Sequence, residues 1–219
     1  MNRLLFSFLL VPVAGCNSNP GGHMDKVAVA EPLLQDGDII FIRVSNFLYR
    51  RVADTSSSWE SHVGIVFRNP DGSCSVAEST VPLSKFSPLE KFVRRSENER
   101  FPVWRCSKPL SDEEKTRLRA AAASRMNTFY NLGFNYDSSR LYCSKFVYDV
   151  YREATGREVG RIQTFSQLLS ENPAAPTWFW RLWFFGFIPW DRRCVTTTSL
   201  LRDESLGTVF DSETSPVQN

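Results

Sequence analysis

Histidine is scarce in this chain of 219 residues, which contains only His23 and His62. It has no CxxC pair and no cluster of Cys and His at ligand spacing, which argues against a structural zinc site. The 26 basic and 24 acidic residues are spread along the chain, so no basic arm or stripe indicates nucleic-acid binding. No apolar run reaches the ~20 residues that span a bilayer. We therefore expect no metal, no cofactor and no nucleic-acid partner.

What the chain does contain is enough apolar material for one well-packed domain, since 42% of its residues are hydrophobic and 13% aromatic. Alternating or isoleucine-rich stretches predict early strands, of which the second and third form an antiparallel pair. These stretches are DGDIIFIRV (36–44), HVGIVF (62–67), SCSVAEST (73–80) and PVWRCS (102–107).

Helix signals lie mostly in the second half of the chain. After a short helical pattern at 46–52, a capping box at Ser111 predicts a helix to about Tyr130. Another helix begins at Cys143 and stops at Gly156, and a capping box at Thr164 opens a short helix that ends near residue 172. Early strands and late helices predict an α+β fold, with an antiparallel sheet packed against helices.

The N-terminus, MNRLLFSFLLVPVAGC, has one basic residue, a short apolar run and small residues, as in a secretory signal. Its end resembles the bacterial lipobox, which implies that residues 1–15 are a lipoprotein signal peptide and that Cys16 carries acyl chains such as palmitate. Asn17 resembles the sorting signal for the outer membrane, on the periplasmic side. An ordinary signal cleaved after Gly15 is the alternative.

The polar composition at both ends sets the predicted domain limits. Residues 16–32 are interpreted as a lipidated flexible tether, 33–206 as the folded domain and 207–219 as a disordered tail. Four cysteines besides Cys16 would enter an oxidising compartment, and spacing leaves open whether Cys74 and Cys106 pair.

Cys143 stands at the start of its predicted helix, where unsatisfied N–H groups and the helix dipole favour a thiolate. A free cysteine is also a common buried hydrophobe, so packing is the alternative. A nucleophilic Cys143 needs a base, and His62 is the one histidine in a predicted strand. A histidine that is simply satisfied in the core is the alternative for His62.

Strand alternation places His62 on one face with Gly64, whose small size would leave room for another chain or a substrate. In the next strand Glu78 shares a face with Cys74 and Val76, where a carboxylate needs a partner. Paired with His62, Glu78 would fix the tautomer and stabilise the imidazolium. A register shift of one residue would instead turn Glu78 to solvent.

The order His62, Glu78, Cys143 resembles the permuted papain-like cysteine hydrolases of the NlpC superfamily, specifically the YiiX/YebB group. The resemblance is carried by DGDIIF, SHVGIV, VAES, NYDSSRLYCSKFVYDVY, QTFSQLL and FWRLWFFGFIPW, and is close to YebB-like proteins. It implies a circularly permuted papain-like (NlpC-type) fold.

The resemblance also implies roles for these residues. Cys143 would be the nucleophile, His62 the base and then the acid, and Glu78 the residue that orients the imidazole. The backbone N–H of Cys143 would stabilise the oxyanion, with Tyr136 or Tyr142 as a possible auxiliary hydroxyl. Lys145 departs from many relatives, which carry an acidic residue there, and this puts a carried-over substrate preference in doubt.

The most aromatic segment, WFWRLWFFGFIPW (178–190), is too short to cross a bilayer. Packing over the sheet is the favoured interpretation, and contact with an acyl chain or a membrane surface is the alternative.

These features together predict a lipid-anchored envelope cysteine hydrolase that cleaves an amide bond in a cell-wall peptide or an acyl-amide. A lipid thioesterase or acyltransferase is one alternative, and a catalytically silent binding lipoprotein is another. Aromatic walls around Cys143 would favour a lipid substrate, and charged groups for a D-amino-acid carboxylate would favour a peptide. The expected partners are that substrate and the membrane, and the oligomeric state stays undetermined.

Overall fold

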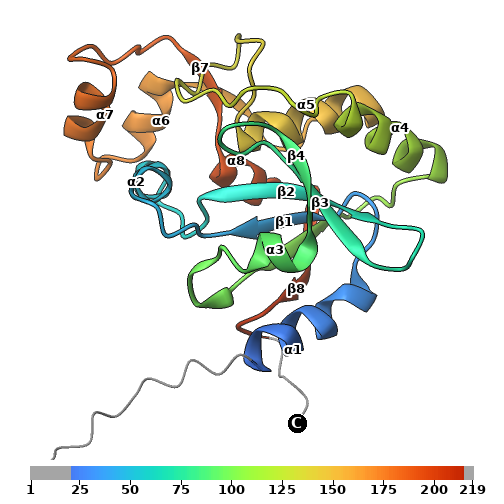
Figure 1. Ribbon diagram of the computed structural model, residues 1–219. Coiled ribbons are helices and arrows are strands. Elements are labelled where there is room, and N and C mark those ends of the chain that lie inside the picture. The colour runs from blue at the N-terminus through green and yellow to red at the C-terminus, as the bar shows by residue number, and fades with distance from the viewer. Residues whose placement is uncertain (1–20, 215–219) are drawn as a thin grey trace, which may run out of the picture.

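The computed structural model describes residues 21–214, and its centre is a six-stranded sheet in the order β4-β3-β2-β1-β5-β8 (Figure 1). Every neighbouring pair in this sheet is antiparallel. The strands are β1 (Ile39–Ile42), β2 (His62–Arg68), β3 (Cys74–Glu78), β4 (Lys85–Pro88), β5 (Pro102–Cys106) and β8 (Leu206–Asp211). The predicted hairpin of 62–67 and 73–80 is confirmed as β2 and β3.

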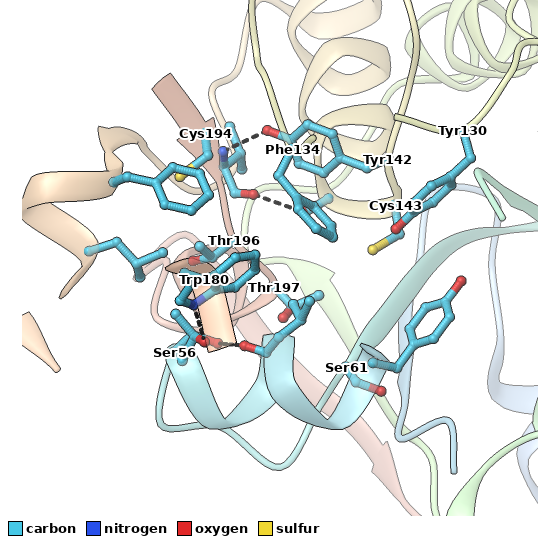
Figure 2. Close-up of a pocket in the computed structure, with 17 residues that line it drawn as sticks. Ser56, Ser61, Tyr130, Phe134, Tyr142, Cys143, Trp180, Cys194, Thr196 and Thr197 are labelled. Atoms are coloured by element: carbon cyan, nitrogen blue, oxygen red, sulfur yellow. Dashed lines mark hydrogen bonds between the residues drawn. The ribbon is translucent and has the colours of Figure 1, made fainter. Parts of the chain in front are cut away.

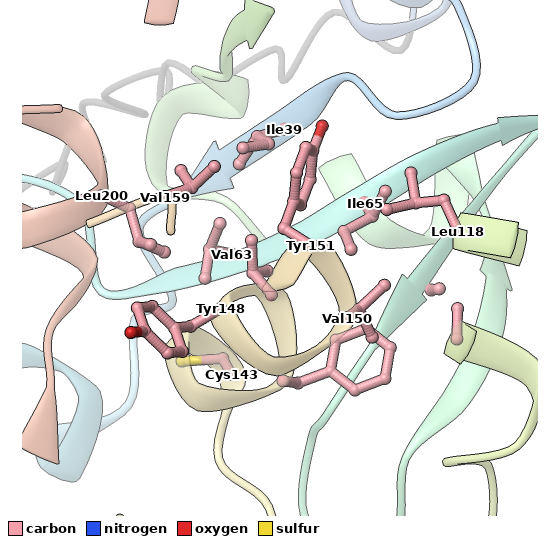
Figure 3. Close-up of a cluster of buried hydrophobic side chains, with 14 of the residues drawn as sticks. Ile39, Val63, Ile65, Leu118, Cys143, Tyr148, Val150, Tyr151, Val159 and Leu200 are labelled. Atoms are coloured by element: carbon pink, nitrogen blue, oxygen red, sulfur yellow. The ribbon is translucent and has the colours of Figure 1, made fainter. Parts of the chain in front are cut away.

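Helices α4 (Asp112–Ala123) and α5 (Cys143–Thr155) cover one face of the sheet (Figure 1). Val147, Val150 and Tyr151 of α5 pack on Ile39 and Ile65, because apolar side chains recur every three or four residues along the helix (Figure 3). Gly156 ends α5 in the left-handed conformation, with φ 70°, as the sequence predicts.

The other face of the sheet is covered by α1 (Gly21–Ala30) and α3 (Leu89–Val93). A third apolar cluster lies beside the sheet, where α6 (Phe165–Glu171) and α7 (Thr177–Trp183) pack together near α2 (Phe47–Thr55). The short strands β6 (Ile162–Thr164) and β7 (Arg193–Val195) pair next to this cluster, and α8 (Thr197–Leu201) follows. Two 3-10 turns, Glu31–Leu33 and Glu97–Glu99, complete the described elements.

The predicted tether is wrong for residues 21–32. Val27 and Ala30 of α1 are buried against the sheet, and the Arg68 guanidinium donates to the carbonyl oxygens of Glu31 and Leu34. The sequence hides this packing because the apolar surface that receives α1 comes from strands far along the chain. The signal peptide, Cys16 and the first residues of the tether lie outside the described residues.

The predicted tail is also wrong for residues 207–214, because β8 pairs with β5 at the edge of the sheet. Phe210 packs on Phe101 with ring centroids 5.3 Å apart, and the Phe101 N–H donates to the Ser212 hydroxyl. Residues 215–219 of the predicted tail lie outside the described residues. The helix predicted to reach Tyr130 ends at Ala123 instead, followed by a loop in which Asn127 has φ 59°.

Two further expectations about packing are wrong. Gly64 leaves no free space, because a Cβ there would meet Val76 Cγ1 at 2.4 Å and the Ala77 carbonyl at 2.9 Å. The aromatic segment does not lie over the sheet, since its buried side chains pack on α6 and on Phe134. No helix among residues 21–214 is both long and apolar enough to cross a membrane.

Candidate active site

Cys143 is the first residue of α5, and 4% of it is exposed. The N-cap residue Tyr142 has extended backbone, and its side chain does not cap the helix. The N–H groups of the first turn of α5 are therefore not capped by Tyr142. Such groups at the start of a helix favour negative charge nearby, where the Cys143 side chain lies. Cys143 therefore lies at the start of a helix, as the sequence predicts for a nucleophile.

His62 begins β2 opposite Ile42 and is fully buried. Its Nε2 lies 2.6 Å from Glu78 Oε2, whereas its Nδ1 is buried without a hydrogen-bond partner in the described structure. Cys143 interacts with the same imidazole. Because Nε2 is held by Glu78, Nδ1 is the nitrogen available to the Cys143 thiol.

The environment of His62 favours the protonated ring. Burial alone lowers its pKa, but the interactions of the ring with Cys143 and with Glu78 outweigh burial, and the net pKa is above the ordinary 6.5. An imidazole that accepts a proton readily is what a cysteine nucleophile requires.

Glu78 is fully buried at the end of β3. The register pairs Ile65 with Ala77, so one step further Glu78 lies opposite Gly64 and diagonal to His62. The predicted pairing of the carboxylate and the imidazole is present, and the shifted register that would expose Glu78 is excluded.

Two further groups hold the Glu78 carboxylate. Arg95 Nη2 lies 2.8 Å from Oε1 and 2.7 Å from Oε2, and the Ser87 hydroxyl donates to Oε1 at 2.7 Å. Burial raises the Glu78 pKa, but the hydrogen bond and charge of His62 and the charge of Arg95 outweigh it and lower the pKa to about 2. Glu78 is therefore ionised at neutral pH and fixed on three sides.

Tyr130 is a site residue that the sequence does not reveal. Its hydroxyl lies beside the Cys143 sulfur and interacts with both the side chain and the backbone N–H of Cys143 (Figure 2). Burial first, and then the Cys143 charge, raise the Tyr130 pKa well above 10, so the hydroxyl keeps its proton and can donate. Tyr130 belongs to the loop before α5, whose position depends on the whole fold.

The two tyrosines expected near the site direct their hydroxyls elsewhere. Tyr142 lines the cavity at Cys143, but its hydroxyl accepts from the Val195 N–H at 2.9 Å (Figure 2). The Tyr136 hydroxyl lies 3.3 Å from Asp149 Oδ1 and 3.4 Å from Arg152 Nη1. The expected auxiliary hydroxyl is therefore wrong for both residues, and Tyr130 occupies that place.

Lys145 is the third residue of α5, and its side chain makes structural contacts. Its Nζ donates to the Ser138 carbonyl at 2.8 Å and pairs with Asp149 at 3.3 Å. These contacts join α5 to the preceding loop and do not reach the described cavity at Cys143.

A small cavity of about 40 Å³, partly open to solvent, lies beside Cys143 (Figure 2). Among the described residues, no Asp, Glu, Lys, Arg or His side chain lines it, and its polar lining consists of hydroxyl and thiol groups and the Trp180 indole. Its apolar walls come from the third cluster, with contributions from Val52, Phe134, Phe165, Leu168 and Trp180.

The other described cysteines lack the features of Cys143. Cys74, Cys106 and Cys194 are free and buried, so the open question of a Cys74–Cys106 disulfide is resolved against pairing. Burial raises the pKa of each thiol, to about 11 for Cys74 and about 12 for Cys194. Within residues 21–214, no group of three or more His, Cys, Asp or Glu side chains is arranged to hold a metal ion.

Comparisons with known proteins agree with this geometry. A family model described as a permuted papain-like amidase enzyme, YaeF/YiiX, C92 family, matches residues 33–210. The protein YiiX of Escherichia coli (strain K12), described as uncharacterized, is 29% identical over 173 residues, which cover 78% of this chain and 77% of YiiX. A crystal structure of yiiX from Escherichia coli O157:H7, described as a metalloprotein, has a TM-score of 0.74 and 26% identity, covering 80% of this chain and 96% of that one.

Proposed function

The chain belongs to the YaeF/YiiX, C92 family of permuted papain-like amidases, and from this premise we propose that Cys143, His62 and Glu78 form its catalytic triad. Membership confirms the fold and the cysteine-hydrolase activity that the sequence predicts. The residue roles rest on the geometry of the site. Cys143 is the nucleophile, His62 the base and then the acid, and Glu78 the group that orients the imidazole.

In the first half-reaction, the Cys143 sulfur attacks the carbonyl carbon of the substrate as its proton moves to His62 Nδ1. Glu78 stabilises the imidazolium through Nε2. The oxyanion of the tetrahedral intermediate accepts hydrogen bonds from the Cys143 N–H and the Tyr130 hydroxyl. The carbon–nitrogen bond then breaks, the amine leaves with the proton from Nδ1, and an acyl thioester remains on Cys143.

In the second half-reaction, His62 takes a proton from a water molecule that attacks the thioester. The carbon–sulfur bond breaks, the carboxylic acid is released, and the proton returns to the Cys143 thiolate. The related yiiX structure is described as a metalloprotein. Residues 21–214 of this chain do not offer a fitting set of ligands, so no step is assigned to a metal.

The substrate that the cavity favours is an acyl-amide, with the apolar acyl group seated against Phe134, Phe165 and Trp180. The single observation that carries this choice is the absence of charged side chains from the described lining of the cavity at Cys143. A peptide carboxylate seated there would lose its hydration without a partner, at a cost of several kcal/mol.

The expected setting is the bacterial envelope, with the domain held at the periplasmic side of the outer membrane by acyl chains on Cys16. This part of the proposal rests on the sequence MNRLLFSFLLVPVAGC, which lies outside the described residues. The substrate and the anchor would then share the same membrane.

The proposed activity is tested by incubating the purified protein with long-chain acyl-amides, short-chain acyl-amides and cell-wall muropeptides, and measuring release of the amine. We expect the long-chain amide to be cleaved fastest, and Cys143→Ser to remove the activity, because an alcohol is far harder to ionise than a thiol. Preferred cleavage of muropeptides, or turnover that survives Cys143→Ser, would contradict the proposal.

A further inference from the structure

Large apolar side chains are exposed on α7, on the turn after it and at the start of α2. These two helices lie at the same end of the molecule (Figure 1). We call this surface the aromatic patch and define it by five residues. Their exposed fractions are 60% for Phe47, 56% for Trp178, 73% for Leu182, 100% for Phe185 and 73% for Phe187. Isolated exposed apolar residues are ordinary, but a contiguous group of this size marks a surface with a partner.

The backbone presents this patch outward. Phe185 has φ 53° and Gly186 has φ 95°, so two consecutive residues adopt the left-handed conformation at the turn after α7. That conformation is costly for a phenylalanine. It leaves the whole Phe185 ring in solvent, while Phe179 and Trp180 on the inner face of α7 stay 2% exposed.

Charged side chains are few around the aromatic patch. Residues 173–190 contain one charged side chain, the exposed Arg181, which makes no ion pair within the described chain. Arg51 lies over the rings of Phe47 and Trp178, at 5.1 and 5.5 Å from their centroids. The nearest acidic residues in sequence are Glu171, Asp191 and Asp54, of which Glu171 pairs with Arg161 and Asp54 pairs with Arg51.

From these observations we propose that the aromatic patch docks on an anionic lipid bilayer, with Phe185 and its neighbours entering the headgroup region. Tryptophan, phenylalanine and arginine on one exposed surface suit the bilayer interface, where aromatic rings partition and arginines meet lipid phosphates. The five side chains have exposed fractions of 56–100%. A rigid protein partner would have to supply a matching pocket for each of them, whereas a fluid bilayer can adapt to them.

The aromatic patch and the cavity at Cys143 share helix α7. Trp180 lines that cavity from the inner face of α7, and Trp178 and Leu182 of the same helix belong to the patch. Docking would thus hold α7, which supplies one wall of the cavity, at the membrane in which an acyl-amide resides. This use of the patch rests on the proposed function, whereas docking itself does not.

The test measures partition of the chain from Asn17 onward, which keeps every described residue and omits the signal peptide and Cys16, onto phospholipid vesicles. The vesicles are phosphatidylcholine alone or an equal mixture with phosphatidylglycerol. We expect stronger binding to the mixture. Leu182→Ser/Phe185→Ser/Phe187→Ser should weaken it by at least about 10-fold, because three apolar side chains no longer insert. Arg181→Gln should reduce the preference for phosphatidylglycerol.

Leu33→Ser is the matched control, since Leu33 is 48% exposed in the turn after α1, outside the patch, and its loss should leave partition unchanged. Equal binding of the triple variant and the control would overturn the proposal. So would a lipid-free dimer, detected by light scattering, that the triple variant abolishes, because the patch would then belong to a second copy. The assay needs no turnover, so failure of docking and failure of the proposed hydrolase activity are separate results.

Discussion

At the scale of single residues, the site depends on how Glu78 is shared. His62, Ser87 and Arg95 all bind its carboxylate, and the first and last of these compete for the same negative charge. His62 gains basicity from Glu78, and Arg95 limits that gain. The chain has only two histidines, so the His62 ring protons can be followed by NMR with little overlap.

Replacing Glu78 with Gln should lower both the His62 pKa and the activity. The amide removes the negative charge, so burial, which lowers the His62 pKa, is opposed by Cys143 alone and no longer by Glu78 as well. We expect turnover to fall by about 100-fold or more, since the imidazolium is no longer stabilised. The NMR titration is made in a Cys143→Ser background to remove the thiol's own ionisation. The control is Glu171→Gln, because Glu171 forms an exposed ion pair with Arg161. An unchanged His62 pKa in Glu78→Gln would place Glu78 outside the triad.

Replacing Arg95 with Met should move the His62 pKa in the opposite direction, upward, because Glu78 then directs its full negative charge at the imidazole. The protonated ring should persist to higher pH, and the alkaline limb of the activity profile should shift upward with it. Arg94→Met, which removes an exposed arginine that pairs with Glu90, is the matched control. A His62 titration identical in both variants would show that Arg95 has no part in positioning the triad.

At the scale of elements, the sequence predicts those whose signals are local. The strands of the β2–β3 hairpin, the capping boxes at Ser111 and Thr164 and the stop at Gly156 all depend on neighbouring residues, and all are present. Helix α1 and strand β8 were missed, because their stability comes from the sheet surface and edge that receive them. The same limit applies to Tyr130, whose loop is placed by long-range packing.

The close contact of β2 and β3 gives a test at this scale. Gly64→Ala should destabilise the protein by about 1–3 kcal/mol, since the new Cβ would meet Val76 and the Ala77 carbonyl below 3.0 Å. Because these strands carry His62 and Glu78, activity should fall as well. Gly207→Ala in β8 is the matched control, as nothing lies within 4 Å of its Cβ position. Equal denaturation midpoints for the two variants would contradict this account of the hairpin.

At the scale of the whole molecule, the sheet separates the catalytic helix from the N-terminal helix. Cys143 begins α5 on one face, and α1 packs on the opposite face (Figure 1). The reversed order of histidine and cysteine in the chain still brings Cys143 and His62 together. The sequence predicts the proximity of His62, Glu78 and Cys143 because His62 has no competitor among strand residues. It fails for the tyrosine hydroxyls because their direction depends on tertiary contacts.

The proposed anchor is tested by Cys16→Ser. We expect the variant to move from the membrane fraction to the soluble envelope fraction of the producing bacterium, because it can no longer carry acyl chains. Circular dichroism should show an intact domain. The control is Cys74→Ser, which removes a buried thiol outside the signal sequence and should leave the partition unchanged. Retention of Cys16→Ser at wild-type levels in the membrane fraction would reject lipidation at this cysteine.

The central claim is that Cys143 is a nucleophile activated by His62, and the alkylation rate of each cysteine by iodoacetamide, followed by peptide mass spectrometry, tests it most directly. The account predicts that Cys143 reacts much faster than Cys74, Cys106 and Cys194, whose thiol pKa values are raised by burial. In folded His62→Ala the Cys143 rate should fall by at least about 10-fold, while the other three stay unchanged. Equal Cys143 rates with and without His62 would contradict the account and leave Cys143 as a packing residue.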